Sequence, residues 1–416
     1  MSKKAFIFPG QGSQYIGMGK SLYENYKIAK DIFDESSGIL NFNLKDLIFN
    51  GDINELTKTE NAQPAILIVS YSIFKVFSNE FEIKPNFLAG HSLGEISALT
   101  CSGSIPFHDA LRLVRQRGLF MKEAAKSDIG IMKSIICEDK TVVENECESI
   151  RDLGEEVVIS NYNSSKQIVI SGTKKAVEMV ADNVKDKVKK IINLEVSAPF
   201  HSPIMESASN KFGEELKKYN YKKGIYTVIS NTDAKPYDNF QEIKDKLKNQ
   251  IILPVQWNQS IEYLVKQGVT CFIEMGPKKV LTDMIKKSYP NMLALSCQDS
   301  NDMNKLKNIL SKDMIKTKIA FISKCIKAAV STKNSNFNSI EYKKGVTEPY
   351  KKIKRIEDTL EKEERRPNES EINEAIIMLK LIFKTKKVPI KEQMEYFNDI
   401  FDEISNKERF INIIQE

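Results

Sequence analysis

The sequence has no long apolar run, no closely spaced pair of cysteines, only three histidines and a single tryptophan among its 416 residues. Without an apolar stretch of about 20 residues, no membrane-spanning helix is expected. The apolar run after the N-terminal lysines is also too short for a secretory signal peptide. The cysteines form no Cys-x-x-Cys motif, which argues against a zinc site and favours reduced thiols in a cytoplasmic protein. These scattered cysteines are Cys101, Cys137, Cys147, Cys271, Cys297 and Cys325.

The overall composition is that of an ordinary soluble protein, with 41% hydrophobic and 28% charged residues. A chain of this length can form two or three domains, and no internal repeat is visible. The lone tryptophan, Trp257, lies in no recognisable motif, so packing in a core is its expected role.

The most informative motif is Gly-x-Ser-x-Gly at residues 90–94, with Ser92 at its centre. The apolar residues 87–89 before it predict the end of a buried strand, and residues 95–99 after it predict the start of a helix. In such a sharp turn, side chains in place of the two glycines would clash. The helix N-terminus directs backbone N–H groups at any oxyanion formed there. The motif therefore predicts that Ser92 is a nucleophile.

A serine nucleophile needs a base, and the chain offers three histidines. His91 is adjacent to the serine, and its side chain is expected to point away from it. His108 lies at an expected helix start and is most simply a surface residue. His201 lies in a polar loop after an apolar strand, between Pro199 and Pro203, which fix the backbone on either side. His201 is therefore the preferred base.

The chain resembles the malonyl-CoA:acyl carrier protein transacylases of fatty acid synthesis and the free-standing acyltransferases of polyketide synthesis. The matching segments recur in family order over about residues 1–300 and are together far more specific than any one of them. They are Phe8–Gln14, Gly90–Glu95, Val114–Gly118, Asn161–Ser164, Ala198–Ser202 and Ile273–Pro277.

The resemblance implies a role for each matching position in acyl transfer. Ser92 would carry the acyl group, and His201 would be its base, held by a backbone carbonyl near Gln250 rather than by a carboxylate. The backbone N–H groups of Gln11 and Leu93 would form the oxyanion hole. The implied substrate is a CoA thioester, the implied partner is acyl carrier protein, and neither a cofactor nor a metal is expected.

The resemblance also implies which residues select the acyl group. Arg117 would bind the free carboxylate of malonyl, and its planar guanidinium suits bidentate contact with a carboxylate. The neighbouring Arg112 and Arg115 are expected to be ordinary surface residues. Gln63 would line the pocket, and Phe200 would narrow it against a methyl branch.

The order of predicted elements indicates an α/β fold with an inserted subdomain. Residues 1–126 alternate short apolar strands with amphipathic helices, which predicts a parallel sheet covered by helices. Residues 127–196 follow the order β-α-β-β-α-β of a ferredoxin-like unit. Residues 197–300 return to the large, hydrolase-like subdomain, so the nucleophile and the base come from opposite sides of the insertion.

One departure from the family pattern lies at the start of the small subdomain. The family usually has small residues after Gly-x-Met, whereas here residues 130–132 are followed by Lys133 and Ser134. Either the lysine reaches solvent or the pocket wall differs, which bears on acyl selectivity and not on the nucleophile and base.

The resemblance does not extend to residues 301–416, which are predicted to form a charged helical extension. Residues 301–355 hold 14 basic and only 4 acidic side chains. Residues 331–345 are polar and predict a linker. Three apolar stripes at helical spacing predict helices with one apolar face: Ile315, Ile319, Ile322, Ile326 and Val330; Ile372, Ile376, Leu379 and Phe383; Ile390, Met394, Phe397, Phe401 and Ile404.

The sequence leaves alternatives open for both parts of the chain. The basic segment of the extension is either a solvated helix face or an electrostatic attractant for an acidic partner such as a carrier protein. Nucleic acid or an anionic membrane would be attracted by the same charge, although no nucleic-acid motif supports the former. For residues 1–300, the alternative to a transferase is a hydrolase that removes acyl groups from a carrier with the same serine and histidine. The extension could also be an interaction module fused to the transferase.

Overall fold

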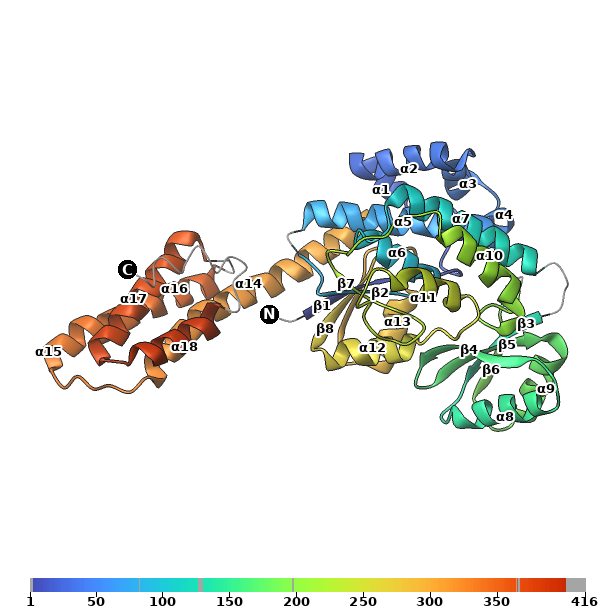
Figure 1. Cartoon of the computed structure of the whole chain (residues 1–416). Helices are drawn as coiled ribbons and strands as arrows, with labels where there is room; N and C mark the ends of the chain where they lie inside the picture. Colours follow the sequence, from blue (N-terminus) through green and yellow to red (C-terminus); the bar gives the residue numbers. More distant parts are fainter. Residues whose placement is uncertain are drawn as a thin grey trace. The chain divides into compact units, whose positions relative to one another are not determined.

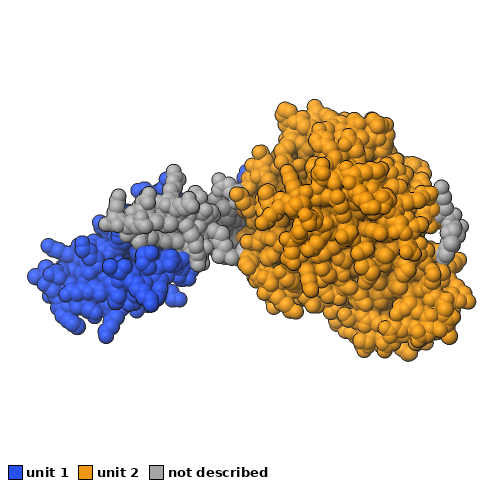
Figure 2. Space-filling view, in the orientation of Figure 1, with its two compact units in different colours: residues 1, 305–416 blue, residues 2–304 orange. Residues whose placement is uncertain are grey.

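The computed structural model describes residues 3–81, 83–125, 130–196, 198–363, 365 and 367–401, with the backbone alone between 308 and 318 and at residue 401. The chain divides into two compact units (Figures 1 and 2). A catalytic unit comprises Ser2–Asn304, and a C-terminal unit begins at Lys305. Within the described part of the chain, no helix is long and apolar enough to cross a membrane.

The catalytic unit is built on a five-stranded sheet in the order β7-β2-β1-β8-β9, with every neighbouring pair parallel. Its strands are short and mostly apolar, as expected for a parallel sheet covered on both faces. Their bounds are β1 Lys3–Phe8, β2 Phe87–Gly90, β7 Thr227–Ile229, β8 Val269–Glu274 and β9 Leu293–Ser296.

Helices cover both faces of this sheet (Figure 1). Side chains alternate along a strand, so Phe6 on β1 packs edge-on against Phe77 of α5, while Ile7 belongs to the core beneath α12 and α13. Trp257, at the start of α12, is 1% exposed in that second core, which confirms its packing role. The helices of the unit are α1 Lys20–Asn25, α2 Lys27–Leu40, α3 Leu44–Asn50, α4 Ile53–Thr57, α5 Thr59–Glu80, α6 Leu93–Cys101, α7 Phe107–Ala124, α10 Glu206–Leu216, α11 Glu242–Gln250, α12 Trp257–Lys266 and α13 Val280–Ser288.

The small subdomain is a four-stranded antiparallel sheet in the order β4-β5-β3-β6, with two helices packed on it. This arrangement confirms the ferredoxin-like β-α-β-β-α-β order read from the sequence. The elements are β3 Gly130–Ile136, α8 Thr141–Asp152, β4 Val157–Ser164, β5 Gln167–Thr173, α9 Lys174–Val184 and β6 Lys190–Asn193.

The C-terminal unit is helical and has a core of its own, in which Phe321, Ile353, Leu379, Phe383 and Phe397 are all 2% exposed or less. Its helices are α14 Ser300–Ser331, which starts just before the boundary between the units, α15 Ser339–Tyr342, a π-helical turn Lys343–Thr347, α16 Glu348–Lys362, α17 Glu369–Lys386 and α18 Ile390–Phe401.

Three expectations for the extension were wrong in part. Val330 is 64% exposed, because the last two steps of its stripe, from Ile322 to Ile326 and from Ile326 to Val330, are each of four residues and each rotate by about 40° on a helix of 3.6 residues per turn. The buried face of α14 includes Ile322 of the stripe but otherwise runs through Phe321, Cys325 and Ala328. The expected linker 331–345 becomes helical at Ser339.

The third stripe is also only partly buried, because Ile390 and Met394 are exposed in the first turns of α18 before it reaches the core at Phe397. The side chains of Ile315 and Phe401 and the whole of Ile404 lie outside the described residues.

Candidate active site

Ser92 lies in the tight turn between β2 and α6, with φ 51° and ψ −106°. A Cβ at Gly90 would lie 1.9 Å from the backbone of Gly94, and a Cβ at Gly94 would lie 2.0 Å from the carbonyl oxygen of Phe8. Both positions therefore require glycine, as the motif predicted. The turn places the serine hydroxyl at the carboxyl ends of the parallel strands, where α/β proteins form their sites.

His201 contacts the serine through one ring nitrogen and the backbone through the other. Ser92 Oγ lies 2.9 Å from His201 Nε2, and His201 Nδ1 lies 2.7 Å from the carbonyl oxygen of Gln250. A carbonyl only accepts hydrogen bonds, so Nδ1 carries the proton and Nε2 presents its lone pair to the hydroxyl. The structure thus brings together Ser92, His201 and Gln250, although Ser92 and Gln250 are 158 positions apart in the chain.

The imidazole of His201 is neutral at physiological pH. It is 4% exposed, and burial, followed by the positive charge of Arg117, lowers its pKa to about 3. A neutral imidazole is the form that can accept a proton from serine.

The other two histidines have different surroundings. His91 Nε2 lies 2.9 Å from Asn163 Oδ1, and its ring also packs edge-on against Trp257. His108 is exposed on α7 and pairs with Glu35. Within the described residues, neither ring forms a hydrogen bond or an ion pair with Ser92, as the sequence suggested.

Arg117 is a buried guanidinium held by uncharged groups. Its Nη1 donates to Gln63 Oε1 at 2.9 Å, and its Nη2 donates to Gln250 Oε1 at 3.0 Å and to Ser92 Oγ at 3.2 Å. Its Nε is buried without a hydrogen-bond partner among the described residues. Burial lowers its pKa to about 10, with Glu95 acting in the opposite direction, so the group remains charged near pH 7.

The two neighbouring arginines are occupied elsewhere. Arg112 is exposed and lies near Asp109, and Arg115 is half-buried and donates to Asn61. Arg117 is therefore the arginine of this helix whose side chain lies in the site, as the resemblance implied.

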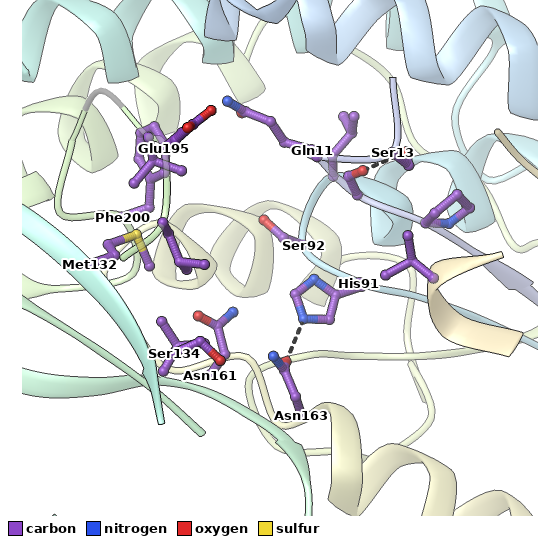
Figure 3. A pocket seen from close by; sticks show the side chains of 18 of the residues that line it. Gln11, Ser13, His91, Ser92, Met132, Ser134, Asn161, Asn163, Glu195 and Phe200 are labelled. Carbon is purple, nitrogen blue, oxygen red and sulfur yellow. Dashed lines mark hydrogen bonds between the residues drawn. The ribbon is translucent and has the colours of Figure 1, made fainter. Parts of the chain in front are cut away.

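A cavity of about 600 Å³ opens above Ser92 between the two subdomains of the catalytic unit. Figure 3 shows Gln11 and Glu195 pointing toward each other on one side of it, and Asn161 and Asn163 on the opposite side. Leu93 also lines the cavity, so the two residues expected to supply the oxyanion hole line the same cavity as Ser92. No group of three or more His, Cys, Asp or Glu in the described residues could hold a metal ion.

The departure at residues 133 and 134 is resolved by strand alternation. Lys133 faces away from the cavity and forms an ion pair with Glu178 of α9, with 2.6 Å between Nζ and Oε2. Ser134 lines the cavity and accepts a hydrogen bond from Gln167 Nε2 at 2.9 Å. The lysine is therefore no part of the pocket wall, and the serine adds a polar group to it.

Two residues of the site were missed in the sequence. Asn231 accepts a hydrogen bond from the backbone N–H of Ser92 at 2.7 Å and donates to the carbonyl of Gly90 at 2.7 Å. Glu95 is 0% exposed and accepts a hydrogen bond from Gln250 Nε2 at 2.5 Å. A signal was available for both: Asn231 closely follows strand β7, and Glu95 is the one charged residue in the apolar helix α6.

The neutral state of His201 can be measured. Ring nitrogen shifts should show Nδ1 protonated and Nε2 bare from about pH 8 down to about pH 5, with the signal assigned by its absence in His201→Gln. Since the folded pKa lies below the unfolded one, this group costs stability as pH falls below about 6.5. An imidazole that titrates between about pH 6 and pH 7 would contradict the burial that we describe.

Comparison with known proteins places these features in a family. The acyl transferase domain family matches residues 5–321. A malonyl CoA-acyl carrier protein transacylase of Bacillus subtilis is 36% identical over 396 residues, covering 95% of this chain and 99% of that protein. A second, from Bacillus subtilis strain 168, is 45% identical over 300 residues, covering 72% of this chain and 94% of that protein. The first match has to include most of the C-terminal unit, whereas the second does not.

Solved structures agree. An acyl carrier protein S-malonyltransferase from Vibrio cholerae superposes with a TM-score of 0.72 at 36% identity, covering 74% of this chain and 100% of that one. A malonyl-transacylase in complex with a type II polyketide synthase acyl-carrier protein gives a TM-score of 0.71 at 36% identity, with the same coverage. The chain therefore belongs to the malonyl CoA-acyl carrier protein transacylase family.

Proposed function

We propose that the chain transfers a malonyl group from malonyl-CoA to the phosphopantetheine thiol of an acyl carrier protein, through a malonyl ester on Ser92. The observation that carries this proposal is one cavity that holds a serine–histidine pair and a buried guanidinium without a carboxylate partner in the described structure. We assign the reaction to fatty acid or polyketide biosynthesis and to the cytoplasm.

In the first half-reaction, Ser92 Oγ attacks the thioester carbonyl carbon while His201 Nε2 accepts the hydroxyl proton. The carbonyl of Gln250 stabilises the imidazolium through its Nδ1–H. The backbone N–H groups of Gln11 and Leu93 donate to the oxyanion of the tetrahedral intermediate. The carbon–sulfur bond then breaks, and the CoA sulfur leaves with the proton from His201.

In the second half-reaction, the same groups act in reverse order. The carrier thiol gives its proton to His201 and attacks the ester carbonyl, and Ser92 leaves and takes the proton back. Ser92 and the Arg117 helix precede the small subdomain, and His201 follows it. We therefore propose that residues 1–126 and 197–300 form one catalytic subdomain, that 127–196 form a small subdomain that closes the cavity, and that 301–416 are a separate extension.

Arg117 binds the free carboxylate of the malonyl group. Its amide partners, Gln63 and Gln250, compensate its burial only partly, and Nε has no hydrogen-bond partner in the part of the chain that the structure describes. An uncharged acyl group leaves this charge uncompensated. Phe200 is buried in the cavity wall and restricts a branch at the α-carbon. An editing hydrolase for neutral acyl chains, the alternative function, has no use for this guanidinium.

The charge of the C-terminal unit favours a role for this unit beside the transfer reaction. Five basic side chains along one helical segment are exposed and form no ion pair within the described part of the unit: Lys343, Lys344, Lys351, Lys352 and Arg355. In contrast, Lys354 of the same segment pairs with Glu357 and Asp358. We propose that the unpaired charges attract the acidic carrier protein to the enzyme.

Acylation on Ser92 is tested by incubation with malonyl-CoA and intact mass measurement. The protein should gain one malonyl group, Ser92→Ala should gain none, and Ser97→Ala, a buried serine one turn along α6, should behave as the parent. His201→Ala should slow both half-reactions by roughly 10²–10⁴-fold, with His108→Ala as control. A malonyl group that persists in Ser92→Ala would exclude the mechanism.

The assignment of Arg117 predicts a change of substrate preference. Arg117→Ala should weaken malonyl transfer by about 2–5 kcal/mol, because a buried charge pair is lost. Its relative activity toward acetyl-CoA, or toward water, should rise. Arg112→Ala, on the exposed side of the same helix, should change neither. Equal use of acetyl-CoA and malonyl-CoA by the unaltered enzyme would favour the editing hydrolase. Because Phe200 restricts a branch at the α-carbon, methylmalonyl-CoA should be a poorer substrate than malonyl-CoA.

The carrier-attracting role is tested by two matched triple variants of the full chain. The first variant, in which Gln replaces Lys343, Lys351 and Lys352, should raise KM for the carrier several-fold at low salt. This rise should become smaller near physiological ionic strength, where charges are screened over ~8 Å. The control variant removes the same charge elsewhere in the unit and should raise KM for the carrier less; in it, Gln replaces Lys384, Lys387 and Lys391. KM for malonyl-CoA should not change. If both triple variants raise KM equally, the attraction depends only on the net charge of the unit. If neither variant changes KM, the basic segment is only a solvated helix face.

A further inference from the structure

Glu95 is a buried carboxyl group directly beneath the nucleophile, three residues after Ser92 on α6. It does not line the cavity. Its Oε2 accepts from Gln250 Nε2 at 2.5 Å and from the backbone N–H of Asn231 at 3.2 Å, and its Oε1 contacts the hydroxyl of Tyr237 at 2.5 Å. One side chain thus anchors both residues that hold the serine turn.

Gln250 connects this carboxyl group to the reacting groups. Its amide oxygen accepts from Arg117 at 3.0 Å, while its amide nitrogen donates to Glu95 and to the carbonyl of Ser92 at 3.0 Å. A guanidinium can only donate and a carboxylate can only accept. The two charges therefore fix which way the amide of Gln250 points, and its backbone carbonyl is the one that holds His201.

We propose that Glu95 is a positioning residue of the transfer reaction: it orients Gln250 and Asn231, and its negative charge competes with the substrate carboxylate for Arg117. The proposal rests on the malonyl transfer function described above, and it goes beyond that function by adding a residue that touches neither substrate nor reacting atom.

The charge of Glu95 can vary in the physiological range. Burial raises its pKa to about 7, against the hydrogen bonds from Tyr237 and Gln250 that favour the ionised form. Two ionisable groups face Glu95 or couple to it: Tyr237, whose pKa is raised well above its usual value, and Arg117. A third, His201, lies on the other side of Gln250 and is bonded to its backbone carbonyl. A proton on Glu95 would lie on Oε1, toward Tyr237, because Oε2 accepts two N–H groups.

The direction of the effect follows from linkage. A malonyl carboxylate stays ionised throughout the neutral range and adds a second negative charge near Arg117, so it disfavours ionised Glu95. By reciprocity, ionisation of Glu95 disfavours malonyl. Malonyl use should therefore weaken as pH rises through the Glu95 pKa, whereas acetyl, which carries no charge, should not be affected in this way.

The experiment measures single-turnover acylation of Ser92 with malonyl-CoA and with acetyl-CoA from about pH 6 to about pH 8, and takes the ratio of their kcat/KM values. The ratio cancels the effects of pH on the serine and histidine. It should fall by about tenfold in the unaltered enzyme, within the usual range of coupling between two sites. In Glu95→Gln, which can still accept from Gln250, the ratio should be independent of pH.

Glu274→Gln is the matched control. Glu274 is also 0% exposed, and burial raises its pKa to about 7, but it accepts from the backbone N–H groups of Leu281 and Thr282 at the start of α13. This variant should keep the tenfold fall. Glu95→Ala removes the anchor itself and should lower kcat for both substrates by about 100-fold, much of which Glu95→Gln should restore.

The outcomes separate the two proposals. A pH-dependent ratio that persists in Glu95→Gln, or an unchanged rate in Glu95→Ala, would overturn the role of Glu95 while malonyl transfer stands. A ratio that becomes flat in Glu274→Gln as well would reduce the effect to a general one of buried carboxyl groups and would also overturn it. If the unaltered enzyme is not malonylated on Ser92, the proposed function fails first and the role of Glu95 fails with it.

Discussion

The hydrogen bonds that hold the backbone of Ser92 are the constraint on which the site depends. At φ 51° and ψ −106° this residue is in a sparsely populated conformation, which persists only when surrounding contacts over-determine it. The N–H of Ser92 is held by Asn231 and its carbonyl by Gln250. These two side chains come from the loop after β7 and the end of α11, so three distant segments have to assemble before the nucleophile is in place.

The same site buries the positive charge of Arg117, and no carboxylate among the described residues forms an ion pair with it. Arg117 is compensated by the amides of Gln63 and Gln250, which are weaker partners than a carboxylate. A substrate carboxylate can therefore improve on the contacts that the empty site provides. The nearby charge also favours the neutral form of His201, so a single guanidinium serves both acyl selection and the protonation state of the base.

Much of the fold and the two reacting residues could be predicted from the sequence, because both have local signals. The signal for Ser92 is the Gly-x-Ser-x-Gly motif with short apolar runs on either side, and the signal for His201 is the pair of prolines beside it. Each signal lies within a few residues of the residue that it identifies. Asn231 and Glu95 were missed although each had a weak local signal, because such a signal does not identify partners that lie 136 to 155 positions away in the chain. The roles of Gln250 and Arg117 came from family resemblance. The exposed Val330 shows how two successive steps of four residues carry an apolar side chain away from a helix core.

The C-terminal unit has its own physical basis as a folded part. Besides its apolar core, it buries Lys386, whose ammonium donates to the carbonyls of Ala329 and Thr332 at 2.7 and 2.9 Å and so satisfies the end of α14. Solved transacylases are covered completely by about three quarters of this chain, so the catalytic fold does not require this unit. A Bacillus subtilis transacylase is nevertheless aligned through most of it. A segment that folds on specific polar and apolar contacts presents its surface lysines in fixed positions, and fixed positions are what distinguish a docking surface from a solvated charged tail.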